Sequence, residues 1–295
     1  MRCGFASLVG RPNVGKSTLL NSLLGMKLAI TSNVSGTTRN VIQGIYNDDD
    51  SQIIFVDTPG VHKPVNKLGN LMNKKAYENA HDVDVILFLI DASTGFGKGD
   101  QFILDKIKDS KLPIFLLLNK IDQVKDKTKL LEEINIVKEK YDFSEIIPIS
   151  AKKNNNITEL ISTLKKYLPE MESIYSEDEI TNVSTRFIMA EFVREKILEL
   201  THDEIPHTVT CYVENYEENS KSIHIQVLVV VDRDNVKKII IGKNGSMLKE
   251  IGTRARHDME EFLGKKVFLE TYVKTIKDWR NQEKYFSELG LEDEE

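Results

Sequence analysis

The chain has 295 residues, of which 40% are hydrophobic and 29% charged, and its formal net charge at pH 7 is -6. This length is enough for two domains, and the net negative charge argues against a protein that coats nucleic acids non-specifically. No apolar run approaches the roughly 20 residues of a membrane helix, and Gly10 interrupts the early apolar stretch, which argues against a signal peptide. The two cysteines, Cys3 and Cys211, have neither metal nor disulfide spacing, so we expect buried thiols in a reducing cytosol.

Strand-like and helix-like segments alternate over residues 1–168, which predicts an α/β fold with a mostly parallel sheet. Apolar runs of strand length are found at 5–9, 53–56, 85–90, 114–118 and 146–149. Helical patterns lie between them, up to Leu24, at 102–107 and at 130–141. Sheets of this kind bind ligands at the carboxyl ends of their strands, so the motifs that follow these runs should form one site.

A complete phosphate-binding loop follows the first predicted strand, with the sequence Gly10-Arg11-Pro12-Asn13-Val14-Gly15-Lys16-Ser17. The backbone N–H groups of such a loop and of the helix that follows it hold phosphates. Lys16 would neutralise the β and γ oxygens, and Ser17 would ligate Mg²⁺. Its place between a strand and a helix favours this function over a purely structural turn.

Two further segments would respond to the γ-phosphate. Gly36-Thr37-Thr38-Arg39 carries threonines that could close over Mg²⁺; chemistry alone does not decide between them, and we assign Thr38 as the ligand. Asp57-Thr58-Pro59-Gly60 ends the second predicted strand, where Asp57 would hold Mg²⁺ through water and the Gly60 amide would sense the γ-phosphate. By itself this tetrapeptide could be a plain turn, but its position after a phosphate loop indicates a nucleotide site.

The base would be read by two motifs at later strand ends, Asn119-Lys120-Ile121-Asp122 and Ser150-Ala151-Lys152. The Asp122 carboxylate can accept the N1–H and 2-amino hydrogens of guanine, and adenine offers neither in that arrangement. The backbone of the second motif would contact the guanine O6. Each motif alone is a common polar turn, whereas four motifs in this order indicate a GTPase. The residues assigned to catalysis are Lys16, Asn13, Thr38 and Gly60.

Val61, which we include in the GTP site, occupies the position where Ras-like enzymes carry the glutamine that orients the attacking water. Valine cannot hydrogen-bond a water, so hydrolysis should be slow or assisted from elsewhere. The combination of Gly-x-Pro-Asn-x-Gly-Lys-Ser with Thr-Thr-Arg resembles translation-factor-related GTPases that have a hydrophobic residue here. That resemblance implies a K⁺ held partly by Asn13 in place of an arginine finger. The alternative, that Asn13 only shapes the loop, remains open.

A second domain follows an acidic, irregular stretch. We place a GTPase domain at 1–170, a linker at 171–185, the second domain at 186–280 and a tail at 281–295. Helical periodicity returns at 187–198, and strand patterns cover 208–216 and 222–231. The apolar run Ile239-Ile240-Ile241 then leads to Gly242-Lys243-Asn244-Gly245, a helix over 246–262 and a strand from Lys266.

This second domain carries a local basic excess, since residues 237–280 contain eleven Lys or Arg and six Asp or Glu. Such an excess suits a confined anionic ligand, although a solvated helix face would give the same pattern. The order of elements, with Gly-x-x-Gly before a helix, resembles an α+β type II KH domain. KH domains clamp about four nucleotides of single-stranded nucleic acid. The resemblance implies RNA contacts by Ile241, Gly242, Lys243, Asn244 and Gly245, extended by Arg254 and Arg256.

Over essentially its whole length the chain resembles the Era-type family of bacterial GTPases, in GRPNVGKSTLLN, IGTRARHDME, LGKKVFLE and WRNQEKYFSELG. The resemblance implies binding of GTP and GDP with Mg²⁺, slow hydrolysis assisted by K⁺, and binding to the 3′ region of 16S ribosomal RNA during 30S subunit assembly. It also implies a cytoplasmic protein with a peripheral fraction at the inner face of the cell membrane; we further expect a monomer. Two departures are Asn244, where relatives usually have a third glycine, and the absence of the usual glutamine before the two threonines.

Two other functional classes stay open. A metabolic kinase or ATPase would also use a phosphate loop, although the two guanine motifs argue against it, and competition between GTP and ATP would discriminate. A membrane or signalling switch would use its second domain to bind protein, and filter binding to short single-stranded RNA would separate that reading from an RNA-binding GTPase.

Overall fold

The structure is a computed structural model of the chain and describes residues 1–32, 37–59, 67–68, 83–202 and 205–282. The chain forms two compact units. The first comprises Met1–Ala29, Thr38–Lys63 and Leu71–Asn182, and the second comprises Ile30–Thr37, Pro64–Asn70 and Val183–Glu295. None of the helices among the described residues is long and apolar enough to cross a bilayer. Both cysteines are buried thiols.

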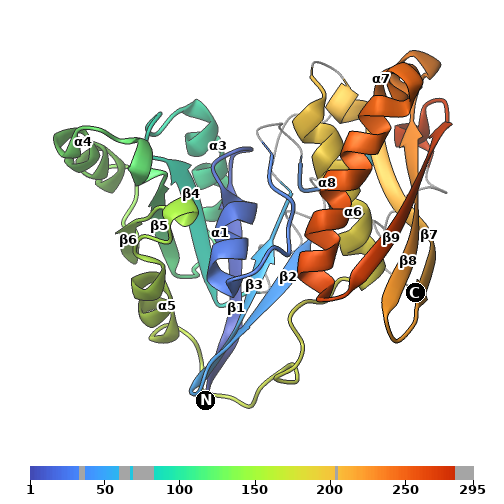
Figure 1. The fold of residues 1–295 in the computed structure, drawn as a ribbon. Coiled ribbons are helices and arrows are strands. Elements are labelled where there is room, and N and C mark those ends of the chain that lie inside the picture. Colours follow the sequence, from blue (N-terminus) through green and yellow to red (C-terminus); the bar gives the residue numbers. More distant parts are fainter. Residues whose placement is uncertain (33–36, 60–66, 69–82, 203–204, 283–295) are drawn as a thin grey trace. The chain divides into compact units, whose positions relative to one another are not determined.

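The first unit contains a six-stranded sheet in the order β2-β3-β1-β4-β5-β6 (Figure 1). The strands are β1 Arg2–Gly10, β2 Ile42–Asn47, β3 Ser51–Asp57, β4 Val85–Asp91, β5 Ile114–Asn119 and β6 Glu145–Pro148. All neighbouring pairs are parallel except β2 with β3. The predicted α/β fold with a mostly parallel sheet is confirmed. The antiparallel edge strand β2 was not predicted, because its alternating polar residues and Gly44 give no apolar run.

Helices pack on this sheet, which accounts for the continuous burial of β3, β4 and β5. They are α1 Lys16–Leu24, α3 Lys98–Ile107, α4 Lys127–Lys138 and α5 Ile157–Lys165. One core cluster joins Ile103 and Ile107 of α3 and Val137 of α4 to residues of β4 and β5. Because the parallel strands run in one direction, the loops that carry the sequence motifs meet at one edge of the sheet.

The segment predicted as a linker is ordered along the outer edge of β2. Ile45 N donates to Ile180 O at 2.9 Å, and Thr181 Oγ1 donates to Gln43 O at 2.7 Å. Gln43 N in turn donates to Asn182 Oδ1 at 2.9 Å. These bonds cover backbone groups that an edge strand would otherwise leave open to another chain. Residues up to Asn182 therefore belong structurally to the first unit.

The second unit has the predicted α+β composition, with one helix, α7, in addition to the predicted elements. Its elements are α6 Thr185–Leu200, β7 Val209–Glu218, β8 Ser222–Val231, α7 Asp234–Ile241, α8 Ser246–Leu263 and β9 Lys266–Thr275. The sheet order is β7-β8-β9, with β7 antiparallel and β9 parallel to β8. Helices α6 and α8 cover one face of this sheet and meet through Phe192 and Phe262, whose ring centroids are 5.8 Å apart (Figure 1).

Helix α7 is an element that the sequence pattern did not assign. Its last three residues, Ile239-Ile240-Ile241, have the composition of a strand. The helix forms because Val236 and Ile240, four residues apart, share a buried face, while Ile239 is 48% exposed. The Gly-x-x-Gly loop therefore joins two helices, α7 and α8.

Candidate nucleotide-binding and nucleic-acid-binding sites

Two glycines allow the phosphate loop to pack against the neighbouring strands. Gly15 has φ +100°, and a Cβ there would lie 2.4 Å from Asn119 Nδ2. A Cβ on Gly10 would lie 2.6 Å from Leu89 O at the end of β4. Such approaches exclude any side chain, which explains both glycines in physical terms. The loop is thus fixed against β4 and β5 before any ligand binds.

Lys16 is held over this loop by the loop's own carbonyl groups. Its Nζ donates to Gly10 O at 3.0 Å and to Arg11 O at 3.1 Å. Burial lowers the pKa of Lys16, and the nearby Asp57 carboxylate opposes that shift. Because neutral carbonyls orient the ammonium without cancelling its charge, that charge remains available to phosphate oxygens.

Ser17, Thr38 and Asp57 converge at the carboxyl end of β3. Ser17 Oγ lies 2.8 Å from Thr38 Oγ1 and 2.7 Å from Asp57 Oδ2. Asp57 is fully buried, and its Oδ1 has no hydrogen-bond partner among the residues that the structure describes. Burial raises the pKa of Asp57 to about 6, against the lowering effects of Lys16 and Ser17. Two hydroxyls and a carboxylate with a spare oxygen are the oxygen ligands that Mg²⁺ prefers, so this donor set fits the metal.

Asn119 ties the phosphate loop to the two guanine motifs. Its Nδ2 donates to Val14 O at 2.8 Å, and its Oδ1 accepts from Ala151 N at 3.0 Å. Ser150 Oγ donates to Asp122 Oδ1 at 2.6 Å, which orients a carboxylate that is otherwise exposed. Three motifs that are far apart in the sequence are therefore brought into one hydrogen-bonded group.

Asp91 belongs to this group, although the sequence pattern did not single it out. Lys120 Nζ lies 2.7 Å from Asp91 Oδ2 and donates to Asn13 O at 2.7 Å. Burial alone would raise the pKa of Asp91, but the bonds from Lys120 and Ser93 lower it. The signal available in the sequence was an acidic residue directly after the fully apolar run 85–90.

The side chain of Arg11 is bound to helix α3. Its Nε donates to Asp100 Oδ1 at 2.7 Å, and Asp100 is fully buried. A Cβ on Gly99 would lie 2.6 Å from Arg11 Cδ, so the glycine makes room for the arginine stem. The predicted contribution of Arg11 to nucleotide binding therefore falls to its backbone.

The remaining predicted residues of the first site lie in the loops after the strands, apart from those outside the described residues. Thr58 is buried, and its Oγ1 donates to Leu8 O at 3.0 Å, so its hydroxyl supports the turn after β3. Asn13 adopts a left-handed backbone with φ 64°. Gly60 and Val61 lie outside the described residues, and Pro12, Pro59, Ile121 and Lys152 keep their predicted places in the loops at the sheet edge.

The Gly-x-x-Gly loop of the second unit uses left-handed backbone at three positions. Gly242 has φ +72°, and a Cβ there would lie 2.7 Å from Met247 Cβ. Gly245 has φ +77°, and Asn244 has φ 52°. Asparagine tolerates this region better than most residues, so Asn244 can adopt the left-handed backbone at the tip of the loop. Lys243 and Asn244 are exposed at the tip.

A groove starts at this loop and follows the junction of α8 with β9. It is lined by Gly245, Leu248, Lys249, Gly252, Thr253, Arg256, Leu269 and Thr271. A second hollow shares Arg256 and is also lined by Glu260, Gly264, Lys265 and Lys266. Apolar side chains beside lysine and arginine suit bases and phosphates respectively, as in single-stranded nucleic-acid sites.

The two predicted arginines of α8 differ in their surroundings. Arg256 lines the groove and pairs with Glu260 at 3.3 Å. Arg254 is exposed, pairs with Glu250 at 2.7 Å, and does not line the groove among the described residues. Lys249 lines the groove but was not predicted. Which basic side chains of α8 face the groove depends on how the helix is rotated about its axis relative to β9, and the sequence does not give that rotation.

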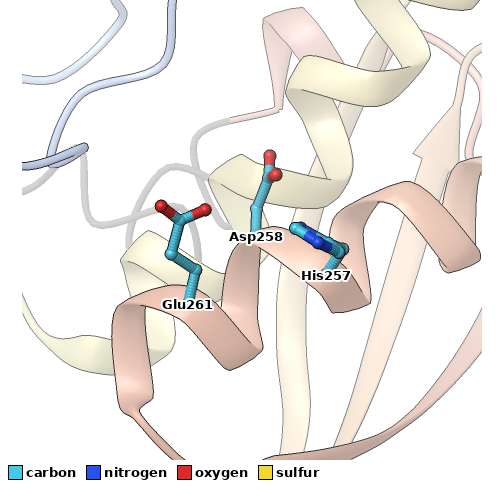
Figure 2. A group of neighbouring side chains, drawn as sticks. All are labelled: His257, Asp258 and Glu261. Carbon is cyan, nitrogen blue, oxygen red and sulfur yellow. The ribbon is translucent and has the colours of Figure 1, made fainter.

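On the neighbouring ridge of α8, His257, Asp258 and Glu261 project close together (Figure 2), with ligand-type atoms within 4.8 Å of one another. Asp258 Oδ2 lies 2.8 Å from Lys196 Nζ of α6. His257 and Glu261 are exposed. Since the ammonium already neutralises one of the two carboxylates, we assign no metal to this cluster.

Comparison with known proteins bears on both units. Residues 5–120 match a family described as 50S ribosome-binding GTPase, and residues 204–280 match the KH domain family. Two solved structures are each 42% identical to the chain, with 99% of both chains covered and a TM-score of 0.95. One is a variant of Aquifex aeolicus Era bound to GDP and AlF₄⁻. The other is Era in complex with MgGDPNP and nucleotides 1506–1542 of 16S ribosomal RNA.

Proposed function

Since this chain belongs to the Era family of GTPases, we propose that it is a GTP-hydrolysing switch that binds 16S ribosomal RNA near its 3′ end and assists small-subunit assembly. The observation that carries the GTPase activity is the convergence of Ser17, Thr38 and Asp57 beside Lys16. The alternatives of a metabolic kinase and of a protein-binding signalling switch lose support, because both units match Era structures over their full length.

In the first unit, the residues divide the work of binding. Lys16 and the loop backbone bind the β and γ phosphates, and Asp122 accepts hydrogen bonds from guanine. Ser17 and Thr38 would hold Mg²⁺ directly and Asp57 would hold it through water. When bound, this ion neutralises charge on the β and γ oxygens. Asn119 and Lys120 position the loop, since both bond to its carbonyl groups.

We extend the proposal to slow hydrolysis assisted by K⁺, with Asn13 as a ligand. The carbonyl of Asn13 accepts a bond from Lys120, so the main chain at this position is fixed from outside the loop. Such anchoring supports a role for the Asn13 side chain beyond shaping the turn. Val61, in the place of a water-orienting glutamine, supports the need for assistance.

In the second unit, the groove of α8 and β9 would receive single-stranded RNA. The glycine loop brings backbone close to sugar-phosphate, Lys243 and Lys249 neutralise phosphates, and the leucines contact bases. We propose that the protein acts as a cytoplasmic monomer on the small ribosomal subunit, with a fraction bound peripherally at the inner face of the cell membrane.

Two measurements on the purified chain test this function. GTP should displace a bound fluorescent GDP, whereas ATP at the same concentration should not, because adenine lacks the donors that Asp122 accepts. A single-stranded oligonucleotide from the 16S 3′ end should be retained on a filter, whereas a duplex of the same length should pass. Equal displacement by ATP, or equal retention of the duplex, would contradict the proposal.

A further inference from the structure

The outer face of the sheet in the second unit carries two large exposed aromatic side chains. Successive side chains of a strand point to opposite faces, and Leu269 and Thr271 of β9 line the groove beside α8. Phe268 and Tyr272 therefore lie on the other face, where they are 47% and 49% exposed. Exposed aromatic rings on a sheet can stack on the bases of single-stranded nucleic acid, so the surroundings of each ring decide whether it can serve this purpose.

Phe268 stacks on His224 of the neighbouring strand. The two residues are register partners in the parallel pair of β8 and β9, and their ring centroids lie 4.7 Å apart with planes inclined by 19°. Because neighbouring strands are themselves about 4.8 Å apart, the rings stand face to face across the two strands. Strand β9 is at the edge of the sheet (Figure 1), so the second face of the Phe268 ring points beyond that edge.

A cation lies at this second face of the ring. Lys266 Nζ is over the Phe268 ring, 5.7 Å from its centroid. The same lysine lines the second hollow, together with Arg256 and Lys265. A cation–π contact at an exposed site is weak, so a base can displace the ammonium, which is then free to pair with a phosphate. The hollow and the ring thus form a continuous surface along the edge of β9.

Two carboxylates near the stack are held by hydrogen bonds on the sheet. Glu270 Oε2 accepts from Gln226 Nε2 at 2.8 Å and from the Tyr272 hydroxyl at 2.9 Å. Glu217, on β7, accepts from Asn215 Nδ2 at 2.9 Å. The side of the stack toward the second hollow carries lysines instead. A polyanion that follows the hollow therefore approaches the stack from its cationic side.

We propose that the Phe268 ring, stacked on His224, is a base-binding subsite for single-stranded RNA that leaves the groove through the second hollow. This inference rests on the proposed binding of RNA in the groove of α8 and β9. A KH groove holds about four nucleotides, so the subsite takes a nucleotide beyond these. Every base has a π face, and the subsite consequently adds affinity with little preference for sequence.

The test measures fluorescence anisotropy of the labelled 16S 3′-end oligonucleotide. Phe268→Ala should lower its affinity about tenfold, the effect of losing one stacked base, and Phe268→Trp should restore it. Tyr272→Ala is the matched control, because it removes an equally exposed ring from the same strand face, and it should bind as the wild type does. Thermal unfolding of all three variants checks that they fold.

Replacing one nucleotide at a time by an abasic residue locates the stacked base. One position should lower wild-type affinity about tenfold and cause no further loss in Phe268→Ala, because the two changes remove the same contact. RNA shortened to the nucleotides that the groove holds should bind both proteins equally.

Unchanged affinity in Phe268→Ala would overturn the subsite and leave this face to a protein partner. Additive losses at every abasic position would overturn it as well. If the wild-type protein itself does not bind the oligonucleotide, the proposed RNA function fails, and the subsite with it.

Discussion

At the nucleotide site, Asp57 is a carboxylate removed from solvent, held on one side by Ser17 and with its second oxygen unpartnered among the described residues. Removal from water destabilises the charged form, which raises its pKa from the usual 3.8 to about 6. Since the folded-state pKa is the higher one, Asp57 favours the folded protein most at acid pH. That contribution is lost as the pH rises through about 6, where Mg²⁺ and nucleotide would offset it.

This shift predicts a pH dependence of Mg²⁺ binding. Protons compete with the metal once the pH falls below the pKa of Asp57, about 6, so affinity should drop about tenfold per pH unit below that value. Titration of Mg²⁺ into protein with a non-hydrolysable GTP analogue, repeated from about pH 5 to about pH 7.5, measures it. Asp91→Asn should leave the profile unchanged, because the pKa of Asp57 is raised to about 6, whereas the bonds from Lys120 and Ser93 outweigh burial and lower that of Asp91. A flat profile would contradict the prediction.

Asp122 predicts a change of base specificity. In Asp122→Asn, one acceptor oxygen becomes a donor, which suits xanthine better than guanine. Affinity for GTP should fall by orders of magnitude, while affinity for XTP appears, since a site built to hydrogen-bond one base rejects a base that leaves its polar groups unpaired by as much as about 10⁴-fold. Competitive displacement of labelled GDP by the two nucleotides measures both. Ser150→Ala, which removes the 2.6 Å bond to Asp122, should weaken GTP without admitting XTP. A variant that still prefers GTP would show that another residue reads the base.

Asn13 predicts a dependence on monovalent cations. GTP turnover should be faster in K⁺ than in Na⁺ at equal ionic strength, and Asn13→Ala should abolish that difference. Because Asn13 has φ 64°, Asn13→Gly, which adopts this backbone without strain and keeps the main-chain carbonyl bound by Lys120, should give the same result. Steady-state phosphate release in the two salts measures all three proteins. Equal wild-type rates in K⁺ and Na⁺ would point to a different catalytic group.

The four nucleotide motifs can be recognised in the sequence, whereas the residues that hold them in place cannot. Each of the four motifs combines rare residue types within a few positions, so its chemistry is local. Asp91 and Asp100 act through partners that lie 29 and 89 positions away in the chain. No local pattern marks such a pair. Only the packing of β4 and α3 against the phosphate loop brings the partners together.

Among the elements, α7 and β2 show how tertiary contacts override local composition. Three consecutive isoleucines favour a strand, yet burial of Val236 and Ile240 on one face selects a helix. In β2 the apolar signal is weak, and the strand is stabilised by pairing on both sides, with β3 and with residues 180–182. Both outcomes depend on neighbours that are distant in sequence.

Substitutions in the loop between α7 and α8 should abolish RNA binding without affecting GTP turnover. Lys243→Asp with Asn244→Asp places two carboxylates where phosphates should lie, in an exposed loop that contributes little to folding. Affinity for the 16S 3′-end oligonucleotide should be abolished, while GTP turnover without RNA should stay at the wild-type value. Lys274→Asp, on the opposite face of β9, is the matched control and should bind RNA normally. Wild-type RNA affinity in the double variant would mean that this loop is only a turn.

At the scale of the whole molecule, a net charge of -6 coexists with a local concentration of cations in the second unit. Five of them lie at the loop or line the two hollows: Lys243, Lys249, Arg256, Lys265 and Lys266. The net negative charge of the chain as a whole disfavours non-specific attraction of polyanions. Binding should therefore be confined to single strands that fit there.

The number of cations at the loop and in the two hollows sets an upper bound on how steeply RNA affinity falls with salt concentration. Each phosphate contact on a single strand contributes about 0.7 to the logarithmic slope, so five contacts give a slope of at most about 3.5. Fluorescence anisotropy of a labelled oligonucleotide at several KCl concentrations measures the slope. Lys266→Ala should lower it by about 0.7 if this residue contacts a phosphate. A much steeper slope would indicate contacts outside the groove.

The asparagine of the Gly-x-x-Gly loop is a site at which the protein can deamidate with time. Asn244 is followed by Gly245, and in such a pair the glycine nitrogen can attack the side-chain amide and release ammonia to form a cyclic succinimide, which water then opens to aspartate or isoaspartate. In the folded loop that nitrogen donates to Gly242 O at 3.3 Å, so the reaction requires the loop to open. Deamidation would place a carboxylate where the proposed RNA phosphates bind, and bound RNA would slow the reaction by keeping the loop closed. The rate of deamidation at Asn244, followed by peptide mass spectrometry, therefore reports how often the loop opens.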